Sequence, residues 1–315
     1  MAKRMLIHDQ GNLSNVPKLN RNLKLMHPKD DTSIAEALAA KIRILCWVIT
    51  HPPNHDKLPV AIKDTWGRKC TKLVFLSTEH DESIPTVKLP VREGRDYLWG
   101  KMKAAIHYIY KNHRQDADWF LRTDDDTYVI MENLRYLLSN YDHRKPLYLG
   151  CRFRSHTPQG YMSGGAGMVL SRDALDRVVK RGLRATNLCD EGDEGDDDDA
   201  KIGICLHRVG VKAVDTRDSE QRGRFWPFSP QDHVVPYTDP DFWYWRYTYY
   251  PSQYGVDCCS DYSISFHYQS PADMYTMEFL IYKLRPFGIQ YSSGRLPKIL
   301  KNSKNLTNIT NWKTT

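Results

Sequence analysis

Short apolar runs alternate with longer amphipathic segments up to about residue 180, and this alternation most constrains the fold. Apolar, largely β-branched runs predict buried strands over residues 43–50, 73–77 and 147–151, and another that starts at 118–121. Helices are predicted over residues 60–67, 97–110, 131–141 and 172–180, the first closed by a glycine. Such alternation predicts an α/β fold, in which helices cover both faces of a mostly parallel sheet.

The second half of the chain differs in composition. Residues 190–199 hold eight acidic side chains, and residues 225–250 hold eleven aromatic ones, which is too dense for chance. A last helix is predicted over residues 272–284, and the polar residues 291–315 are expected to be a loosely ordered tail. Residues 1–40 are polar and weakly periodic, which is typical of a stem or an N-terminal arm.

Three adjacent carboxylates, Asp124, Asp125 and Asp126, follow directly on the strand predicted near residue 119. Ligands of parallel sheets bind beyond the carboxyl ends of the strands. Because side chains alternate in an extended chain, Asp124 and Asp126 should face the same way while Asp125 points elsewhere. Two oxygen ligands of this kind suit Mg²⁺ or Mn²⁺ that bridges to a diphosphate, and the alternative is a solvated acidic turn.

Other polar residues are weaker candidates by themselves. Arg95 and Lys101 could hold phosphate oxygens, or could be exposed cations at a helix start. His267 would become a metal ligand only with a partner such as the aspartates, since a lone histidine in a strand is usually structural. Asp198 and Asp199 adjoin a helix start at residues 200–205, where a carboxylate could be positioned as a general base. Otherwise they belong to a solvated loop.

Composition narrows the class of protein. The net charge is +7, yet no run rich in Lys and Arg resembles a nucleic-acid-binding arm, so no nucleic-acid partner is expected. The seven cysteines form no CxxC pair, and N-x-S/T triplets begin at Asn12, Asn305 and Asn308, which favours a secretory route with disulfides. The longest apolar run, residues 42–49, is far below the ~20 residues that span a bilayer, so no anchor is visible. A lost anchor and a soluble secretory form both stay open.

Cysteine pairing stays open at this point, because six paired cysteines allow 15 arrangements. Our hypotheses are Cys46 with Cys70 and Cys189 with Cys205. The adjacent Cys258 and Cys259 either bridge each other or take separate partners.

Seven motifs in unbroken order resemble the core 1 β1,3-galactosyltransferases of glycosyltransferase family 31: EGRDYLWGK, RTDDDTYV, GYMSGGAGMVLS, AVDTRDS, FWYW, CCSD and SISFHY. The likeness runs from about residue 42 to 289. It implies the GT-A fold, a Rossmann-like α/β domain with an acidic metal motif, here over residues 41–290, with a donor half (41–170) and an acceptor half (171–290). It also implies transfer of galactose from UDP-galactose to the 3-hydroxyl of N-acetylgalactosamine on Ser or Thr of glycoproteins. The implied cofactor is Mn²⁺, the implied location is the Golgi membrane with a lumenal catalytic domain, and a homodimer is compatible with it.

The resemblance implies roles for individual residues. It assigns Asp124, Asp126 and His267 to the metal, and it makes Asp199 the catalytic base, or Asp198, since the family's Glu-Asp pair falls here within a run of aspartates. The donor-binding residues would be His51, Arg95, Asp96, Lys101 and Tyr268. Trp243 and Tyr244 would form the acceptor wall, unless these aromatics are simply a packed lid. Cys151 is extra to the family's usual six lumenal cysteines.

Three rival functions stay open. The first is a non-catalytic chaperone or binding relative on the same fold, and the second is a metal-dependent phosphohydrolase. The third is a family 31 transferase with another donor or acceptor. The long acidic run and the extra cysteine suggest a divergent paralogue.

Overall fold

The computed structural model describes residues 30–235, 239, 241–287, 289 and 299. The three N-x-S/T triplets, most of the predicted stem and nearly all of the predicted tail lie outside the described residues.

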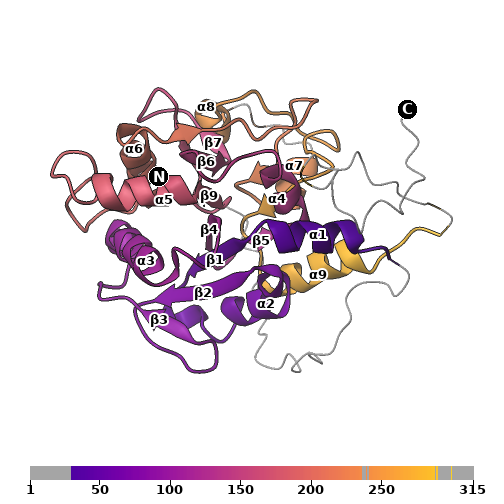
Figure 1. Cartoon of the computed structure of the whole chain (residues 1–315). Coiled ribbons are helices and arrows are strands. Elements are labelled where there is room, and N and C mark those ends of the chain that lie inside the picture. The colour runs from indigo at the N-terminus through magenta and orange to yellow at the C-terminus, as the bar shows by residue number, and fades with distance from the viewer. Residues whose placement is uncertain (1–29, 236–238, 240, 288, 290–298, 300–315) are drawn as a thin grey trace.

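A seven-stranded sheet forms the centre of the molecule, with strand order β10-β6-β9-β4-β1-β2-β3 (Figure 1). β9 runs antiparallel to both of its neighbours, and the other neighbouring strands are parallel, so the predicted mostly parallel α/β sheet is confirmed. The strands are β1 (Ile44–Ile49), β2 (Lys72–Ser77), β3 (Thr86–Lys88), β4 (Trp119–Asp124), β6 (Leu147–Gly150), β9 (Met168–Ser171) and β10 (Lys212–Ala213).

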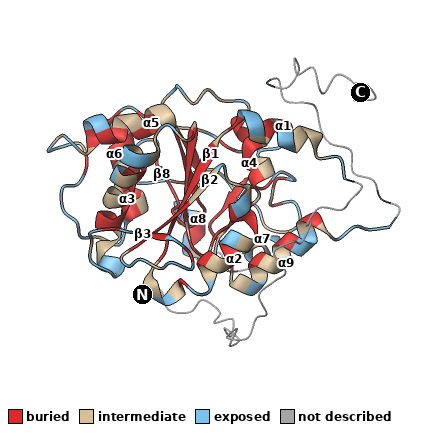
Figure 2. Ribbon diagram, turned by 60° about the horizontal axis from the view of Figure 1, so that its bottom comes forward, coloured by how far each residue is buried: buried red, intermediate tan, exposed pale blue. Residues whose placement is uncertain are grey.

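Helices cover both faces of this sheet because its strands are apolar on both sides. In β1, Leu45 and Trp47 pack towards one layer, and Ile44 and Cys46 pack towards the other. Figure 2 shows the buried strands β1 and β2 between the two layers of helices. The first layer contains α3 (Leu98–His113), α5 (Arg172–Arg177) and α6 (Asp198–Arg208). The second contains α1 (Ser33–Lys41), α2 (Leu58–Asp64), α4 (Met131–Leu138) and α9 (Pro271–Tyr282).

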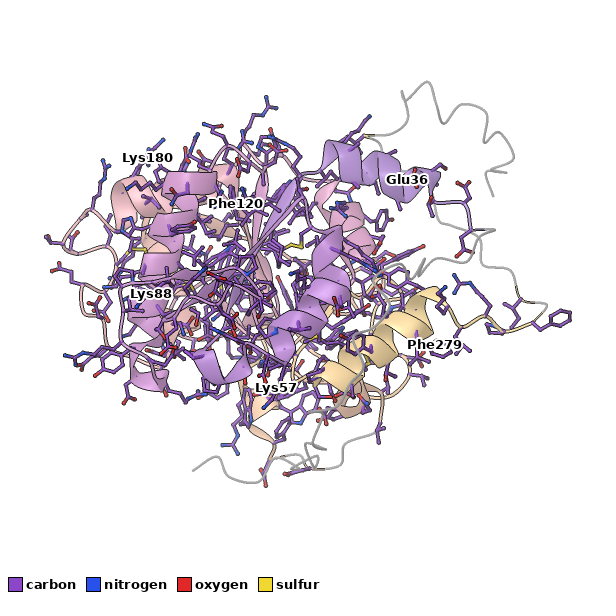
Figure 3. The ribbon with its side chains drawn as sticks, turned by 90° about the horizontal axis from the view of Figure 1, so that it is seen from below. Glu36, Lys57, Lys88, Phe120, Lys180 and Phe279 are labelled. Carbon is purple, nitrogen blue, oxygen red and sulfur yellow. A yellow bond between two sulfur atoms is a disulfide. The ribbon has the colours of Figure 1, made fainter. Side chains whose placement is uncertain are left out.

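Side chains fill the space between the sheet and these layers, as Figure 3 shows from below. Phe120 of β4 is fully buried at the centre, whereas Lys180 lies at the rim and Phe279 lies on the outer side of α9. No helix in the described ranges has the length and the apolar character that crossing a bilayer requires.

A second, three-stranded sheet positions the chain around the acidic triplet. It consists of β5 (Tyr128–Val129), β12 (Ser265–Phe266) and β11 (Phe225–Trp226). β5 follows the acidic triplet closely and pairs antiparallel with β12. This pairing brings β12, from the second half of the chain, next to the end of β4. A hairpin of β7 (Arg152–Phe153) and β8 (Tyr161–Met162) and the short helices α7 (Pro230–Val234) and α8 (Trp243–Tyr247) complete this side.

Several predicted boundaries were wrong in detail. Gly67 does not close α2, which ends at Asp64; it lies in a 3₁₀ helix (Trp66–Lys69), where a Cβ would come within 2.7 Å of the Ile62 carbonyl oxygen. The α-helical part of the helix predicted over 172–180 stops at Arg177 and continues as a π-helical turn. β9 was not predicted, because four residues after a glycine cluster carry too short a pattern.

The disulfides follow the hypotheses made from the sequence. Cys46 bonds Cys70 and Cys189 bonds Cys205, while Cys258 and Cys259 bridge each other. Cys151 is a free thiol, and burial raises its pKa to about 12.

The Cys46–Cys70 disulfide should contribute measurably to stability. It closes a separation of 24 residues between β1 and the start of β2, so its removal frees the unfolded chain. We expect the double variant Cys46→Ala/Cys70→Ala to lower the free energy of unfolding by about 3 kcal/mol, measured by urea denaturation. Cys151→Ala removes no crosslink and should lose less; a double-variant loss below about 1 kcal/mol would contradict the prediction.

Candidate active site

The end of β4 and the end of β12 together build a cluster of potential metal ligands. The pairs Ser265↔Val129 and Phe266↔Tyr128 place His267 beside the turn that follows β4. The backbone N–H of Gln269 donates to the carbonyl of Asp126 at 2.8 Å, so the backbone pairing continues beyond the two strands to Asp126 itself. The antiparallel pairing is therefore what brings His267 to the aspartates.

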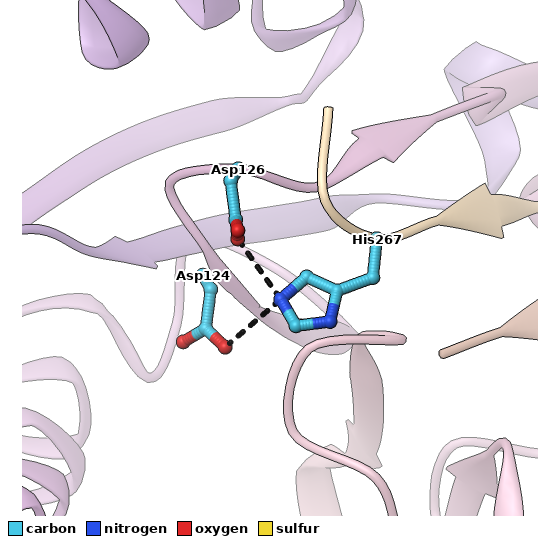
Figure 4. A group of neighbouring side chains, drawn as sticks. All are labelled: Asp124, Asp126 and His267. Atoms are coloured by element: carbon cyan, nitrogen blue, oxygen red, sulfur yellow. Dashed lines mark ion pairs between the residues drawn. The ribbon is translucent and has the colours of Figure 1, made fainter. Parts of the chain in front are cut away.

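Asp124, Asp126 and His267 point at one another (Figure 4). The His267 Nε2 atom lies 3.0 Å from Asp126 Oδ1 and 3.8 Å from Asp124 Oδ2, and one ligand atom from each residue lies within 4.8 Å of the others. The other ring nitrogen, Nδ1, faces the Pro227 carbonyl oxygen at 3.3 Å, which orients Nε2 towards the carboxylates. Burial by itself would lower the pKa of His267, but the charges of Asp126 and Asp124 raise it overall. Two carboxylates and one imidazole form a donor set that could hold a divalent metal ion.

Asp125 points away from this cluster, as the alternation of side chains predicted. Its Oδ2 atom accepts hydrogen bonds from Thr50 Oγ1 at 2.6 Å and Asn54 Nδ2 at 3.0 Å. Burial raises its pKa to about 7. Asp125 therefore ties the turn after β4 to the end of β1.

The glycine-rich segment between β8 and β9 is shaped around His267. A Cβ on Gly165 would lie 2.0–2.4 Å from three atoms of the His267 ring, so the ring lies directly on this backbone. The Gly165 carbonyl also accepts a hydrogen bond from Thr127 Oγ1 at 2.8 Å. Only glycine leaves room for the imidazole here.

Asp198 and Asp199 open α6 and differ in their surroundings. Asp198 is 6% exposed and bonds Arg122 Nη2 at 2.9 Å, and burial raises its pKa to about 7. Asp199 is half-buried, and its oxygens accept from the backbone N–H groups of Gly164 at 3.1 Å and Ala200 at 2.8 Å. Burial also raises its pKa. Asp198 is thus committed to an ion pair, whereas Asp199 is held by backbone donors.

The predicted donor-binding residues occupy different environments. His51 follows β1, whose Ile49 pairs with Asp124, so His51 lies on the same edge as the triplet. Arg95 and Asp96 are exposed in a 3₁₀ helix (Arg95–Tyr97). The Lys101 ammonium is buried and bonds the Thr50 carbonyl at 2.8 Å and the Glu93 carboxylate at 3.0 Å. Lys101 is therefore engaged within the protein rather than presented to a ligand.

Tyr268 is 46% exposed beside the metal-ligand cluster. Its ring stacks on His267 at 3.9 Å between centroids. Burial and the charges of Asp126 and Asp124 raise its pKa, and Arg95 opposes this shift. Tyr268 therefore lies within electrostatic range of both aspartates and of Arg95.

Trp243 and Tyr244 separate into a surface and a core residue. Tyr244 is 3% exposed and packs on Phe228 with ring centroids 5.3 Å apart, whereas Trp243 is 43% exposed at 5.7 Å from the same ring. Phe228 also lies parallel to Tyr268, 6.3 Å away. A row of rings therefore leads from the metal-ligand cluster to the exposed Trp243.

His233 is buried within these aromatics and should contribute a part of the stability that is lost in acid. Its ring packs on Trp226 at 4.4 Å, and burial lowers its pKa to about 3 from an ordinary value near 6.5. The stabilisation is complete above pH 6.5 and is lost as the pH falls towards 3, because the unfolded chain then binds the proton first. The contribution of His233 should fall by about 2 kcal/mol from pH 7.5 to pH 5. Asp125 and Asp198 act in the opposite direction, because their raised pKa values favour the folded state as the pH falls, and both are present in the wild type and the variant. Urea denaturation should therefore show that, between pH 7.5 and pH 5, the stability of the wild type falls by about 2 kcal/mol relative to that of His233→Phe. The same change with pH in both proteins would contradict the assignment.

Comparison with known proteins adds to this geometry. Residues 39–220, which include the acidic triplet, the glycine-rich segment and Asp199, match the model of the Fringe-like family. The chain belongs to the Fringe-like family. It is 45% identical over 282 residues to glycoprotein-N-acetylgalactosamine 3-beta-galactosyltransferase 1 of Xenopus laevis, an alignment that covers 89% of this chain and 77% of that protein. It is 29% identical over 193 residues to the beta-1,3-glucosyltransferase of Mus musculus, covering 60% of this chain and 38% of that protein.

The Fringe-like domain identifies an enzyme, a glycosyltransferase of family 31 that uses an activated sugar donor. The resemblance drawn from the seven motifs is confirmed. Two features of the Fringe-like site were missed by sequence reasoning: the buried Arg122, and the roles of individual glycines. The signal for Arg122 was present, because an arginine inside a buried strand needs a partner.

Proposed function

We propose that this chain is an inverting galactosyltransferase that transfers galactose from UDP-galactose to the 3-hydroxyl of N-acetylgalactosamine, O-linked to Ser or Thr of glycoproteins. The observation that carries the proposal is the convergence of Asp124, Asp126 and His267 at the carboxyl end of β4, within 4.8 Å of one another. The 45% identical relative from Xenopus laevis, which carries this activity in its name, supports the choice of donor and acceptor.

Asp124, Asp126 and His267 would hold Mn²⁺, which when bound offsets the negative charge of the departing diphosphate. His51, Arg95 and Tyr268 would contact the nucleotide or its phosphates. Three observations support this: Tyr268 stacks on His267, Arg95 acts electrostatically on Tyr268, and His51 follows the strand that pairs with β4. Asp96 belongs to the same short helix as Arg95, and Lys101 would act indirectly, since it holds Glu93 and the end of β1 in place.

Asp199 is the proposed general base. The acceptor oxygen forms a bond to the anomeric carbon from the face opposite UDP, the bond to UDP breaks, and Asp199 takes the hydroxyl proton. This single displacement inverts the anomeric centre and needs no covalent intermediate, as in inverting glycosidases. Its raised pKa favours proton uptake, and the N–H groups of Gly164 and Ala200 fix the carboxylate.

The exposed Trp243 would present a face to the acceptor sugar, while Tyr244 supports it from the core. We further propose a Golgi location with a lumenal catalytic domain, which the three disulfides support. We also propose a homodimer, and only the resemblance to the core 1 β1,3-galactosyltransferases supports it.

The test is a panel of UDP-sugars assayed with an N-acetylgalactosamine glycopeptide, with and without Mn²⁺. We expect transfer from UDP-galactose that requires the metal and is lost in Asp126→Asn. A preference for another UDP-sugar would indicate a different family 31 activity. Phosphate release without acceptor would indicate a phosphohydrolase, and metal-independent UDP binding with no transfer would indicate a non-catalytic relative.

A further inference from the structure

Arg122 is a cation buried at the centre of the proposed site. It belongs to β4, is 2% exposed, and lies two residues before Asp124. Its Nη2 atom is 3.0 Å from Asp124 Oδ1 and 2.9 Å from Asp198 Oδ2. One nitrogen therefore joins a proposed metal ligand on the sheet to the first turn of the helix that carries Asp199.

The same guanidinium packs against the backbone that holds Asp199. A Cβ on Gly164 would lie 2.6 Å from Arg122 Nη1, so the glycine leaves space for the guanidinium. The N–H group of Gly164 donates to Asp199 Oδ2. Arg122 thus lies between the proposed metal ligand Asp124 and the backbone that holds Asp199, and it contacts both.

The hydrogen bonding of the Arg122 guanidinium is incomplete. Within the described part of the chain, Nε and Nη1 are buried without a hydrogen-bond partner, so a single nitrogen makes the contacts to both carboxylates. Leaving buried donors unpaired costs free energy. Such a departure from full pairing is expected where a residue serves a site.

The recorded contact of Arg122 with Asp124 is to one oxygen. Arg122 takes Oδ1, and the other oxygen, Oδ2, is the one directed at His267 Nε2. This leaves one oxygen of Asp124 for a cation and fixes the direction in which it points. We propose that Arg122 is a positioning residue, which orients Asp124 as a one-oxygen metal ligand and couples it through Asp198 to the placement of Asp199. This inference rests on the proposed function and deepens it.

The two possible roles of the Arg122 guanidinium, as a positive charge or as a group that orients Asp124, predict opposite changes in metal affinity when it is removed. If the guanidinium acted only as a positive charge, its removal would strengthen the binding of a divalent cation, because like charges repel. If it orients Asp124, its removal should weaken binding 10–100-fold, as is typical when a residue that orients a ligand is lost. The sign of the change therefore separates the two roles.

The experiment is a titration of the whole protein with Mn²⁺ alone, followed by electron paramagnetic resonance. We expect Arg122→Met to weaken Mn²⁺ binding 10–100-fold. Arg122→Lys should recover most of the affinity, because both contacts come from one nitrogen and an ammonium can replace it. Unchanged or tighter binding by Arg122→Met would overturn the inference.

Two further measurements separate a loss of positioning from a loss of folding. Arg122→Met leaves Asp198 buried without its partner, so Arg122→Met/Asp198→Asn removes both charges and should restore the unfolding midpoint. A restored midpoint with Mn²⁺ binding still weakened supports positioning, and restored binding in this double variant contradicts it.

The second measurement is the kinetics of Arg122→Met at saturating Mn²⁺. A residual loss in kcat with KM for the donor unchanged would report displacement of Asp199. Absence of Mn²⁺ binding by the wild-type protein would instead overturn the proposed function itself.

Discussion

Asp199→Asn is expected to lower turnover at least ~10²-fold, the scale of general-base catalysis, with UDP binding retained. The amide keeps the size of the side chain, and its oxygen can still accept from the Gly164 or Ala200 N–H group, so the local structure should persist. It cannot, however, take the acceptor proton. The measurements are kcat with the glycopeptide acceptor and calorimetric binding of UDP in the presence of Mn²⁺.

Neighbouring aspartates provide matched controls for this variant. Asp197→Asn changes an exposed carboxylate of the same acidic run, 3.7 Å from Lys201, and should leave kcat unchanged. Asp198→Asn keeps an acceptor for Arg122 and should lose less than Asp199→Asn. Near-normal turnover of Asp199→Asn would remove it from the role of base, and a larger loss in Asp198→Asn would shift the role to that residue.

Gly165→Ala should be the second most damaging change in the site. The added methyl group would lie 2.0–2.4 Å from three atoms of the His267 ring, closer than any real contact, so the imidazole must leave its present position 3.0 Å from Asp126. We expect Mn²⁺ affinity to fall about 10–100-fold and kcat to fall with it. Mn²⁺ titration and steady-state kinetics measure the two effects.

Gly192→Ala is the control for Gly165→Ala. Its Cβ would lie 3.5 Å from Asp190 Oδ1, an ordinary contact in an exposed loop, so neither Mn²⁺ affinity nor kcat should change. The urea midpoint of each variant shows whether the protein is folded. A folded Gly165→Ala protein with wild-type Mn²⁺ affinity would mean that His267 is not a ligand.

Local patterns in the sequence were enough to predict much of the fold. Apolar runs such as those of β1 and β2 predicted the buried strands, because a strand buried on both faces must be apolar throughout. Alternation of side chains predicted that Asp125 would face away from Asp124 and Asp126, and its bonds to Thr50 and Asn54 agree. These features depend only on neighbours along the chain.

Other assignments came from the resemblance and not from any pattern in the residues. His267 by itself was indistinguishable from a structural histidine, since nothing near it in the sequence offers a second ligand. The motif SISFHY, compared with the family, assigned it to the metal. The structure brings it within 3.0 Å of Asp126 through the pairing of β12 with β5.

What the sequence by itself determined was the class of the fold, the edge of the sheet that carries the acids, and the direction each acid faces. Only the tertiary structure decided which distant groups meet there. In the tertiary structure Asp198 pairs with Arg122, whereas Asp199 accepts from the backbone N–H of Gly164. Lys101 is buried and bonds Glu93. The physical reason is that periodicity and hydrophobicity act over a few neighbouring residues. Contacts between remote segments depend on the path of the whole chain through its packed core.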